Sequence, residues 1–238
     1  MATDKIIVAL DVDEAEQALR LARQIKEYLT FFKIGSQLFT REGPDLVKRL
    51  LDLGIDVFLD LKFHDIPETV RKSVRAASAL GVRFLTIHTS GGAEMIRAAL
   101  DGASEASSST PVTVLGVTVL TSVDGETLRE IGFTHSPAGQ VLHLARLGQG
   151  AGLRGLVCSP LEIEPIRRQL GQEIILVTPG IRSASAPADD QKRTLSAAEA
   201  LRLGASHLVV GRPITAAPDP VAAAMALLGE VSAAESGS

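Results

Sequence analysis

The sequence predicts an α/β protein, a (β/α)8 TIM barrel formed by a single domain over residues 1–238. Strand-like and helix-like segments alternate along the whole chain. The strand-like segments are short, β-branched and almost continuously apolar, which is typical of a parallel sheet covered on both faces. Eight such βα units in 238 residues fit a closed barrel better than an open, doubly wound sheet.

The individual elements follow from two periodicities. Short apolar runs that end at polar or glycine residues predict strands over 6–11, 31–35, 57–62, 84–89, 113–120, 155–160, 174–180 and 207–212. Apolar residues at intervals of three and four predict helices over 14–28, 42–53, 66–80, 93–100, 139–150 and 161–170. The last ten residues, 229–238, are polar and small, and we expect them to form a flexible tail.

Composition narrows the class of protein. The chain is 45% hydrophobic and 22% charged, with a formal net charge of −4 and no long block of Lys or Arg, which argues against a nucleic-acid or membrane-surface binder. Nothing near Met1 resembles a signal peptide, and no apolar stretch reaches the roughly 18 residues of a membrane span. The single cysteine, Cys158, follows Leu156 and Val157, which predicts a buried, inert thiol. We therefore expect a soluble, cytoplasmic protein.

Polar side chains gather at the predicted carboxyl ends of the strands, where barrels of this kind assemble their sites. Each residue alone is compatible with an ordinary solvated strand end. Their convergence on one rim predicts a functional site. The residues are Asp11, Lys33, Asp60, Lys62, His88, Thr89, Thr121, Ser122, Arg182 and Arg212.

The third predicted strand carries the most informative pattern, Asp-Leu-Lys-Phe-His-Asp at 60–65. Because side chains alternate along a strand, Asp60 and Lys62 are expected on one face. Val57, Leu59 and Leu61 are expected on the other face. Burying two charges costs several kcal/mol per ion unless they are paired. A structural ion pair is one explanation, and a catalytic pair is the other.

The last two strands predict a phosphate site. Gly211 lets the backbone approach an anion closely, and the planar guanidinium of Arg212 matches phosphate oxygens. Pro213 suits the first turn of a helix whose free N–H groups face the same anion. The polar segment between Ile181 and Leu195, with Gln191 as its best hydrogen-bonding residue, is either a lid over a ligand or a disordered surface loop.

Six short motifs resemble the orotidine 5'-phosphate decarboxylase family, and the resemblance extends from Ile6 to about Leu228. It implies a homodimer without metal or cofactor, with sites at the subunit interface, that converts orotidine 5'-phosphate to UMP and CO2 in the final step of UMP biosynthesis. Asp-x-Lys-x-x-Asp alone is shared with related sugar-phosphate enzymes. The motifs are ALD at 9–11, FKIG at 32–35, DLKFHDIPETV at 60–70, TVLTS at 118–122, TPGIR at 178–182 and VVGRPI at 209–214.

The resemblance also implies roles for individual residues. Lys62 would protonate C6 of the pyrimidine, Asp60 would lie near the scissile carboxylate, and Lys33 would belong to the same charged array. Asp65 would reach into the partner's site. The remaining residues would bind substrate: Ile66 and Thr69 beside Asp65, Asp11 and Lys33 at the ribose hydroxyls, Thr121, Ser122 and Pro179 at the base, and Arg182, Gln191, Gly211 and Arg212 at the phosphate.

These residue types suit the implied chemistry. Loss of CO2 from C6 leaves a carbanion that the ring delocalises poorly, and no electron-sink cofactor is suggested by the sequence. A fixed ammonium at Lys62 would stabilise that charge and deliver a proton to it. Flanking carboxylates would keep the ammonium charged.

Two rival functions are compatible with part of the pattern. A 3-keto-gulonate 6-phosphate decarboxylase or hexulose phosphate synthase uses the same short motif with a divalent metal, which needs surrounding carboxylates. Lys33 instead places a cation there, and the segments at 118–122 and 178–182 favour a pyrimidine nucleotide. A catalytically inactive phosphate-binding barrel would keep Gly211 and Arg212 but need not keep Lys62 between two acids.

Overall fold

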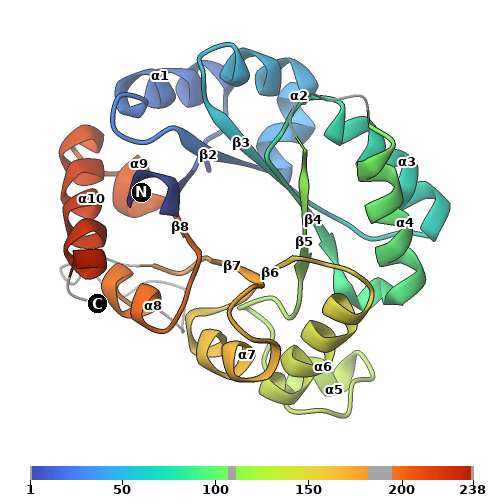
Figure 1. Ribbon diagram of the computed structural model, residues 1–238. Helices are drawn as coiled ribbons and strands as arrows, with labels where there is room; N and C mark the ends of the chain where they lie inside the picture. Colours follow the sequence, from blue (N-terminus) through green and yellow to red (C-terminus); the bar gives the residue numbers. More distant parts are fainter. Residues whose placement is uncertain (1, 107–110, 182–194, 237–238) are drawn as a thin grey trace.

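The computed structural model describes residues 2–106, 111–181 and 195–236. Within these ranges eight parallel strands close into a barrel in sequence order, which confirms the predicted (β/α)8 fold (Figure 1). The strands are β1 (Ile6–Ala9), β2 (Phe31–Gly35), β3 (Asp56–Phe63), β4 (Phe84–His88), β5 (Thr113–Val117), β6 (Gly155–Val157), β7 (Ile175–Thr178) and β8 (His207–Val210).

Helices form a ring outside the strands (Figure 1). Several begin at side-chain caps: Asp124 accepts hydrogen bonds from two backbone N–H groups of α5, and Ser136 and Ser196 cap α6 and α8. The α-helices are α1 (Ala15–Ile25), α2 (Ser36–Leu51), α3 (Pro67–Ser78), α4 (Gly92–Ser104), α5 (Gly125–Glu130), α6 (Pro137–Gly150), α7 (Ile163–Leu170), α8 (Ala197–Arg202), α9 (Arg212–Thr215) and α10 (Pro220–Ser236); the 3-10 helices are η1 (Ala2–Lys5), η2 (Thr89–Gly91) and η3 (Pro160–Glu162).

Two apolar layers hold the barrel together. The larger one lies between strands and helices and includes Val57 and Leu59 of β3. The smaller one fills the barrel interior, where Phe84 packs edge-to-face on Phe31 and Phe58 with ring centroids 5.1 and 5.9 Å apart. Alternation of side chains along each strand supplies both layers.

A polar and aromatic cluster closes the barrel at the amino ends of the strands. The guanidinium of Arg83 lies 4.6 Å from the ring centroid of Phe31 and forms ion pairs with Asp4 at 2.6 Å and Asp56 at 2.9 Å. His207 Nδ1 donates a hydrogen bond to the Asp4 backbone oxygen, 2.9 Å away. This closure leaves the carboxyl ends as the open mouth of the barrel.

Most predicted strands overran the observed ones at their carboxyl ends. The predicted runs 6–11, 113–120 and 155–160 end as strands at Ala9, Val117 and Val157. The overrun residues include Asp11, Val119 and Ser159, which leave the sheet and line the mouth of the barrel.

Two helical predictions need correction. Helix α2 starts at Ser36 rather than residue 42, and it bends at Gly43, whose φ of 67° precedes Pro44, so the apolar pattern restarts there. The flexible tail predicted from residue 229 is wrong for 229–236, which belong to α10. Val231 is fully buried, and Glu235 pairs with Lys5 at 2.9 Å. Alanine-rich composition favours helix there despite its weak amphipathic pattern.

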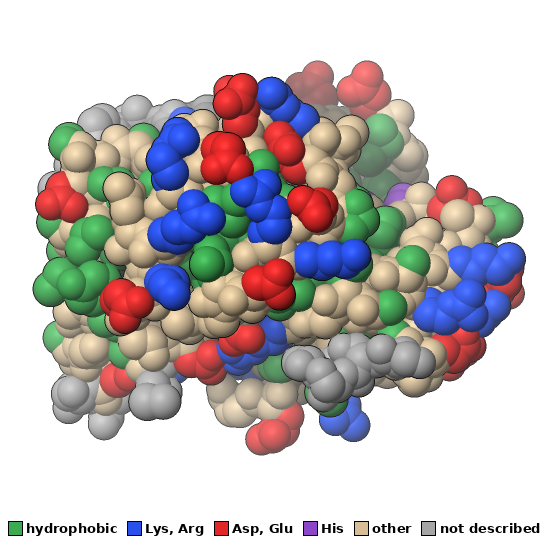
Figure 2. All heavy atoms as spheres, turned by 90° about the horizontal axis from the view of Figure 1, so that it is seen from above, with side chains coloured by type: hydrophobic (Ala, Val, Ile, Leu, Met, Phe, Trp, Pro, Cys, Tyr) green, Lys and Arg blue, Asp and Glu red, His purple; other side chains and the backbone are tan. Residues whose placement is uncertain are grey.

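Part of the outer surface carries interspersed charges of both signs. Figure 2 shows acidic and basic side chains intermingled over one face of the molecule. Ion pairs between surface residues include Arg49 with Glu16 and Arg41 with Glu14. The first pair connects α2 to α1, and the second connects α2 to the residue before α1. No helix in the part of the chain that the structure describes is long and apolar enough to cross a membrane.

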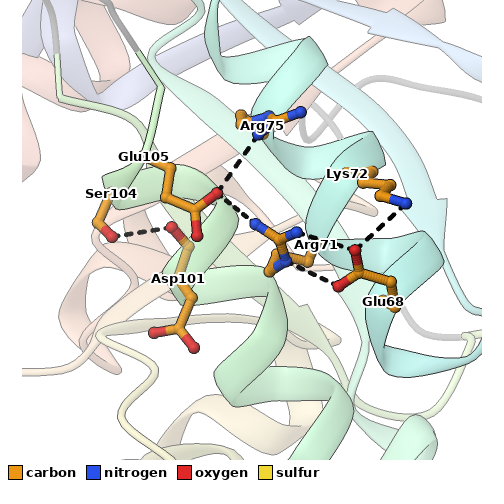
Figure 3. A network of polar contacts seen from close by, with 7 residues as sticks. All are labelled: Glu68, Arg71, Lys72, Arg75, Asp101, Ser104 and Glu105. Atoms are coloured by element: carbon orange, nitrogen blue, oxygen red, sulfur yellow. Dashed lines mark hydrogen bonds and ion pairs between the residues drawn. The ribbon is translucent and has the colours of Figure 1, made fainter.

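Helices α3 and α4 pack closely and are joined by charged side chains. The Arg71 guanidinium lies between Glu68, 2.8 Å away on α3, and Glu105 at the end of α4 (Figure 3). A Cβ placed on Gly102 of α4 would lie 2.1 Å from the Arg71 backbone oxygen, so the two backbones meet where only glycine fits. Helix α3 therefore has a fixed position at the carboxyl end of β3.

We expect Gly102→Ala to lower the free energy of unfolding by about 1–3 kcal/mol, because the added methyl group forces α3 and α4 apart. Gly229→Ala is the matched control, since Gly229 lies in α10 with nothing within 4 Å of the added Cβ. That change should raise stability by about 0.5–1 kcal/mol. Denaturant unfolding measures both, and equal effects of the two changes would contradict the close-packing argument.

Candidate active site

Two lysines share one carboxylate at the mouth of the barrel. Lys62 Nζ on β3 lies 2.8 Å from Asp60 Oδ2, and Lys33 Nζ on β2 lies 3.7 Å from the same oxygen. Lys33 also donates a hydrogen bond to Asp11 Oδ1 just beyond β1, at 3.2 Å. Three adjacent strands thus assemble an alternating array of charges, Asp11–Lys33–Asp60–Lys62. Lys33, Asp60 and Lys62 come together as expected, and Asp11 is the fourth member of the array.

Asp60 is held ionised by its neighbours. Its side chain is only 13% exposed. Burial on its own raises the pKa of the carboxyl, but Lys33, Lys62 and hydrogen bonds from Lys62 and Thr86 outweigh burial, so the pKa of Asp60 lies below its ordinary value of 3.8. Asp60 therefore carries a fixed negative charge in a poorly hydrated place.

A break in the β3–β4 pairing shapes this array. Register partners are Leu59 with Leu85 and then Phe63 with Ile87, so Asp60, Leu61 and Lys62 all lie opposite Thr86. Lys62 has a φ of 51°, a left-handed conformation that costs a non-glycine residue about 1–3 kcal/mol. Asp60 and Lys62 do share a patch as predicted, but a bulge, not regular strand alternation, brings them together.

The array borders a cavity of about 680 Å³ at the barrel mouth. Its charged side is formed by Asp11, Lys33, Asp60 and Lys62, and interior apolar side chains form its floor. Ligand sites typically combine such an apolar lining with a few oriented polar groups. Its lining residues are Ala9, Asp11, Lys33, Phe58, Asp60, Lys62, Val117, Val119, Leu120, Thr121, Val157, Cys158, Ser159, Pro179, Gly180, Ile181, Val209, Gly211, Arg212 and Pro213.

The predicted phosphate residues Gly211 and Arg212 lie in the same cavity. Helix α9 begins at Arg212 with Pro213 in its first turn, as predicted. A Cβ on Gly211 would lie 3.4 Å from Asp11 Oδ2, so a side chain there would crowd the charged array. Thr121 and Pro179 also line the cavity, as expected for residues near a bound base.

Four residues to which the resemblance gives catalytic or substrate-binding roles lie outside this cavity in the single chain, as do His88 and Thr89 of the predicted rim. Asp65, Ile66, Thr69 and Ser122 are exposed, and the Asp65 carboxylate accepts a hydrogen bond from the Ile66 backbone N–H at 2.6 Å. Asp65 therefore does not join the Lys33–Asp60–Lys62 array within its own subunit. The predicted residues Arg182 and Gln191 fall outside the described residues, between Ile181 and Leu195, which form an isolated parallel bridge.

The cysteine and one histidine complete the surroundings. Cys158 is buried as predicted, and burial raises the pKa of its thiol to about 12, so it stays protonated. His88 at the end of β4 stacks obliquely near His64, with ring centroids 5.6 Å apart. Burial, His64 and Lys62 lower the pKa of His88, so it is neutral near pH 7.

Sequence reasoning missed the apolar floor and one polar contact. Phe58, Val117 and Val157 point inward, and strand alternation at these positions is the signal that could have identified them. Thr86 was also missed. Its hydroxyl donates a hydrogen bond to Asp60 Oδ1 at 2.9 Å. No short sequence motif predicts a contact across a bulge.

No three His, Cys, Asp or Glu side chains among the described residues lie close enough together to hold a metal ion. The fold and the cavity define a class: a (β/α)8 barrel with a Lys–Asp–Lys charge array and a Gly-Arg-Pro loop at the carboxyl ends of its strands. The chain belongs to the orotidine 5'-phosphate decarboxylase / HUMPS family, whose model matches residues 4–227.

Individual relatives are similar to this chain in sequence or structure over nearly its full length. The chain is 50% identical to an orotidine 5'-phosphate decarboxylase of Nitrosococcus oceani, covering 98% of this chain and 99% of the relative. It is 48% identical to one of Opitutus terrae, covering 97% and 99%. A crystal structure of orotidine 5'-phosphate decarboxylase from Lactobacillus acidophilus superimposes with a TM-score of 0.86 at 38% identity, covering 95% of this chain and 98% of that chain.

The lowered pKa of Asp60 predicts a pH-dependent contribution to stability. Because its folded pKa lies below the ordinary 3.8, ionised Asp60 stabilises the fold above that value, and the contribution is lost as pH falls through the folded pKa. We expect Asp60→Asn to be less stable than the wild type by about 1.5–3 kcal/mol at pH 7. Urea unfolding should show the difference shrinking from about pH 5 to about pH 2; a difference that stays constant over this interval would contradict the assignment.

Proposed function

We propose that the chain decarboxylates orotidine 5'-phosphate to UMP and CO2, the final step of de novo UMP biosynthesis. The observation that carries this proposal is the Lys33–Asp60–Lys62 array beside a 680 Å³ cavity, in a chain 50% identical to a named orotidine 5'-phosphate decarboxylase. An apolar floor faces the array, which suits a flat pyrimidine ring next to a charged reacting centre.

Lys62 is the proposed proton donor. Its ammonium borders the cavity and is held by Asp60 at 2.8 Å. As the bond from C6 to the carboxylate breaks, negative charge develops on C6, and a fixed cation there stabilises it without reorganising solvent. The Nζ–H bond then gives its proton to C6, leaving UMP and a neutral amine that is reprotonated by solvent.

Asp60 has the second proposed role. Its lowered pKa keeps it anionic, so it would repel the substrate carboxylate in the bound state and lose that repulsion when neutral CO2 leaves. The same anion keeps Lys62 oriented in a partly buried place. Lys33, which bridges Asp60 and Asp11, is proposed to bind ribose hydroxyls together with Asp11.

The side of the cavity formed by Gly211 and Arg212 is proposed to bind the phosphate. Gly211 and Arg212 supply a close backbone approach and a guanidinium, and Arg182 and Gln191 are proposed to complete this subsite from the neighbouring segment. Thr121, Ser122 and Pro179 are proposed to contact the base. Phosphate binding remote from C6 supplies energy that can be used at the reacting carbon.

A homodimer is proposed to complete the site. The exposed group of Asp65, Ile66 and Thr69 at the start of α3 supports it, because Ile66 is an apolar side chain left 68% exposed. In the proposed dimer this group would enter the partner's cavity. The close packing of α3 against α4 would then fix the position of Asp65 relative to the partner's Lys62.

We expect Lys62→Ala to lower kcat by at least about 10⁴-fold while the protein stays folded, because both the proton donor and the cation at C6 are lost. Loss of orotidylate ultraviolet absorbance, recorded with a chelator present, measures it. Lys48→Ala, on the exposed side of α2, is the control and should match the wild type.

Two outcomes would contradict the proposal. Wild-type protein that leaves orotidylate unchanged but consumes a ketose phosphate only when a divalent metal is added would support the metal-dependent members of the superfamily. Full activity of Lys62→Ala would remove its role as proton donor.

Mixed subunits test the interface. Lys62→Ala and Asp65→Ala proteins should each be inactive, but in a mixed dimer one site combines an intact Lys62 with an intact Asp65 from the partner chain. Random exchange makes half of the dimers mixed, so we expect about one quarter of wild-type activity. Mass spectrometry confirms subunit exchange, and no recovered activity despite proven exchange would argue against a shared site.

A further inference from the structure

The β3–β4 bulge leaves one β4 residue facing three β3 residues. Leu59 pairs with Leu85 and Phe63 with Ile87, so Thr86 alone faces the tripeptide that contains Asp60 and Lys62. A regular ladder cannot satisfy the backbone there. The Lys62 N–H group, displaced by its φ of 51°, needs a hydrogen-bond partner from a side chain.

The Thr86 hydroxyl fills that position and reaches Asp60 as well. Its oxygen accepts a hydrogen bond from the Lys62 backbone N–H at 2.9 Å. Its own hydrogen is donated to Asp60 Oδ1, also at 2.9 Å. A hydroxyl has one hydrogen, so it can donate only one of these two hydrogen bonds and must accept the other. The donor-to-acceptor order is therefore fixed: Lys62 N–H donates to Thr86, and Thr86 donates to the carboxylate. Thr86 is fully buried, and its β-branched side chain has few alternative rotamers.

Both carboxylate oxygens of Asp60 are therefore assigned. Oδ1 belongs to Thr86, and Oδ2 faces the Nζ atoms of Lys62 at 2.8 Å and Lys33 at 3.7 Å. Without the contact at Oδ1, the carboxylate plane is free to turn about its terminal torsion, which is intrinsically soft. Nothing in the Asp60 side chain itself would then keep Oδ2 directed at the two lysine ammonium groups.

We propose that Thr86 is a positioning residue for the reaction. Its hydroxyl orients the Asp60 carboxylate and holds the left-handed backbone of Lys62, so that one buried group aligns the two charged side chains at the reacting carbon. The inference rests on the proposed decarboxylation. Thr86 does not line the cavity, so it acts through Asp60 and Lys62 rather than on substrate.

Thr86→Val tests the hydroxyl with little change in shape. We expect kcat to fall about 10- to 100-fold, the range that corresponds to one hydrogen bond to a charged group. The KM for orotidylate and the Kd for UMP should change less than about threefold, because the phosphate loop is untouched. Thr86→Ser restores the hydroxyl and should return kcat to within about threefold of the wild type.

Thr89→Val is the matched control. Thr89 belongs to the predicted rim of polar residues but does not line the cavity. It is equally buried, and its hydroxyl donates to the Val117 backbone oxygen at 2.8 Å rather than to Asp60. Loss of that bond should lower thermal stability by an amount similar to Thr86→Val but leave kcat within about twofold of the wild type. A purely structural role for Thr86 predicts that the two variants behave alike.

The outcomes separate this inference from the proposed function. Wild-type protein inactive on orotidylate overturns the proposed function and the role of Thr86 in it. Active wild type with unchanged kcat in Thr86→Val overturns only the positioning role, as does a kcat loss that Thr86→Ser fails to recover. If Thr86→Val does not fold, Thr86→Ala removes the same hydroxyl with a smaller side chain and is judged by the same criteria.

Discussion

The site depends on one buried carboxylate. Asp60 is 13% exposed and is shared by the ammonium groups of Lys62 and Lys33. Desolvation of such an anion costs several kcal/mol unless cations and hydrogen bonds replace water. Here two lysines and a threonine hydroxyl replace it, and the net effect lowers the pKa of the carboxyl. Its fixed charge sets where Lys62 lies, and the proposed proton transfer follows from that placement.

The barrel makes this arrangement possible because the residues that stabilise the fold and the residues of the site lie at different ends of the strands. Phenylalanines of the interior and the Arg83 cluster close the amino ends of the strands. The carboxyl ends then carry strained and charged groups, including the left-handed Lys62. The cost of about 1–3 kcal/mol for that backbone conformation is offset by burial elsewhere, and the bulge turns Lys62 into the cavity instead of leaving it in a regular ladder.

Much of this could be predicted from the sequence, because the two periodicities that define strands and helices are local. The eight strands and the convergence of Asp11, Lys33, Asp60 and Lys62 followed from apolar runs with polar ends. The bulge was not predictable, since nothing in Asp-Leu-Lys marks the register of a neighbouring strand. For the same reason Thr86, two residues before His88 in an apolar strand, was overlooked.

Other differences have equally physical causes. The last helix was mistaken for a tail because alanine and serine give little amphipathic contrast, although Val231 is fully buried against the barrel. Asp65 is exposed in the single chain, and its expected place in the partner's site came from the family resemblance rather than from its spacing to Lys62. Spacing in a sequence does not reveal whether two residues meet within a subunit or between subunits.

A crystal structure with UMP bound tests the central claim most directly. The account predicts that Lys62 Nζ lies within about 3.5 Å of C6, with Asp60 beside the position that the departing carboxylate occupied. A complex in which Lys62 Nζ lies well away from C6, or in which Lys33 is the nearer ammonium, would contradict the account.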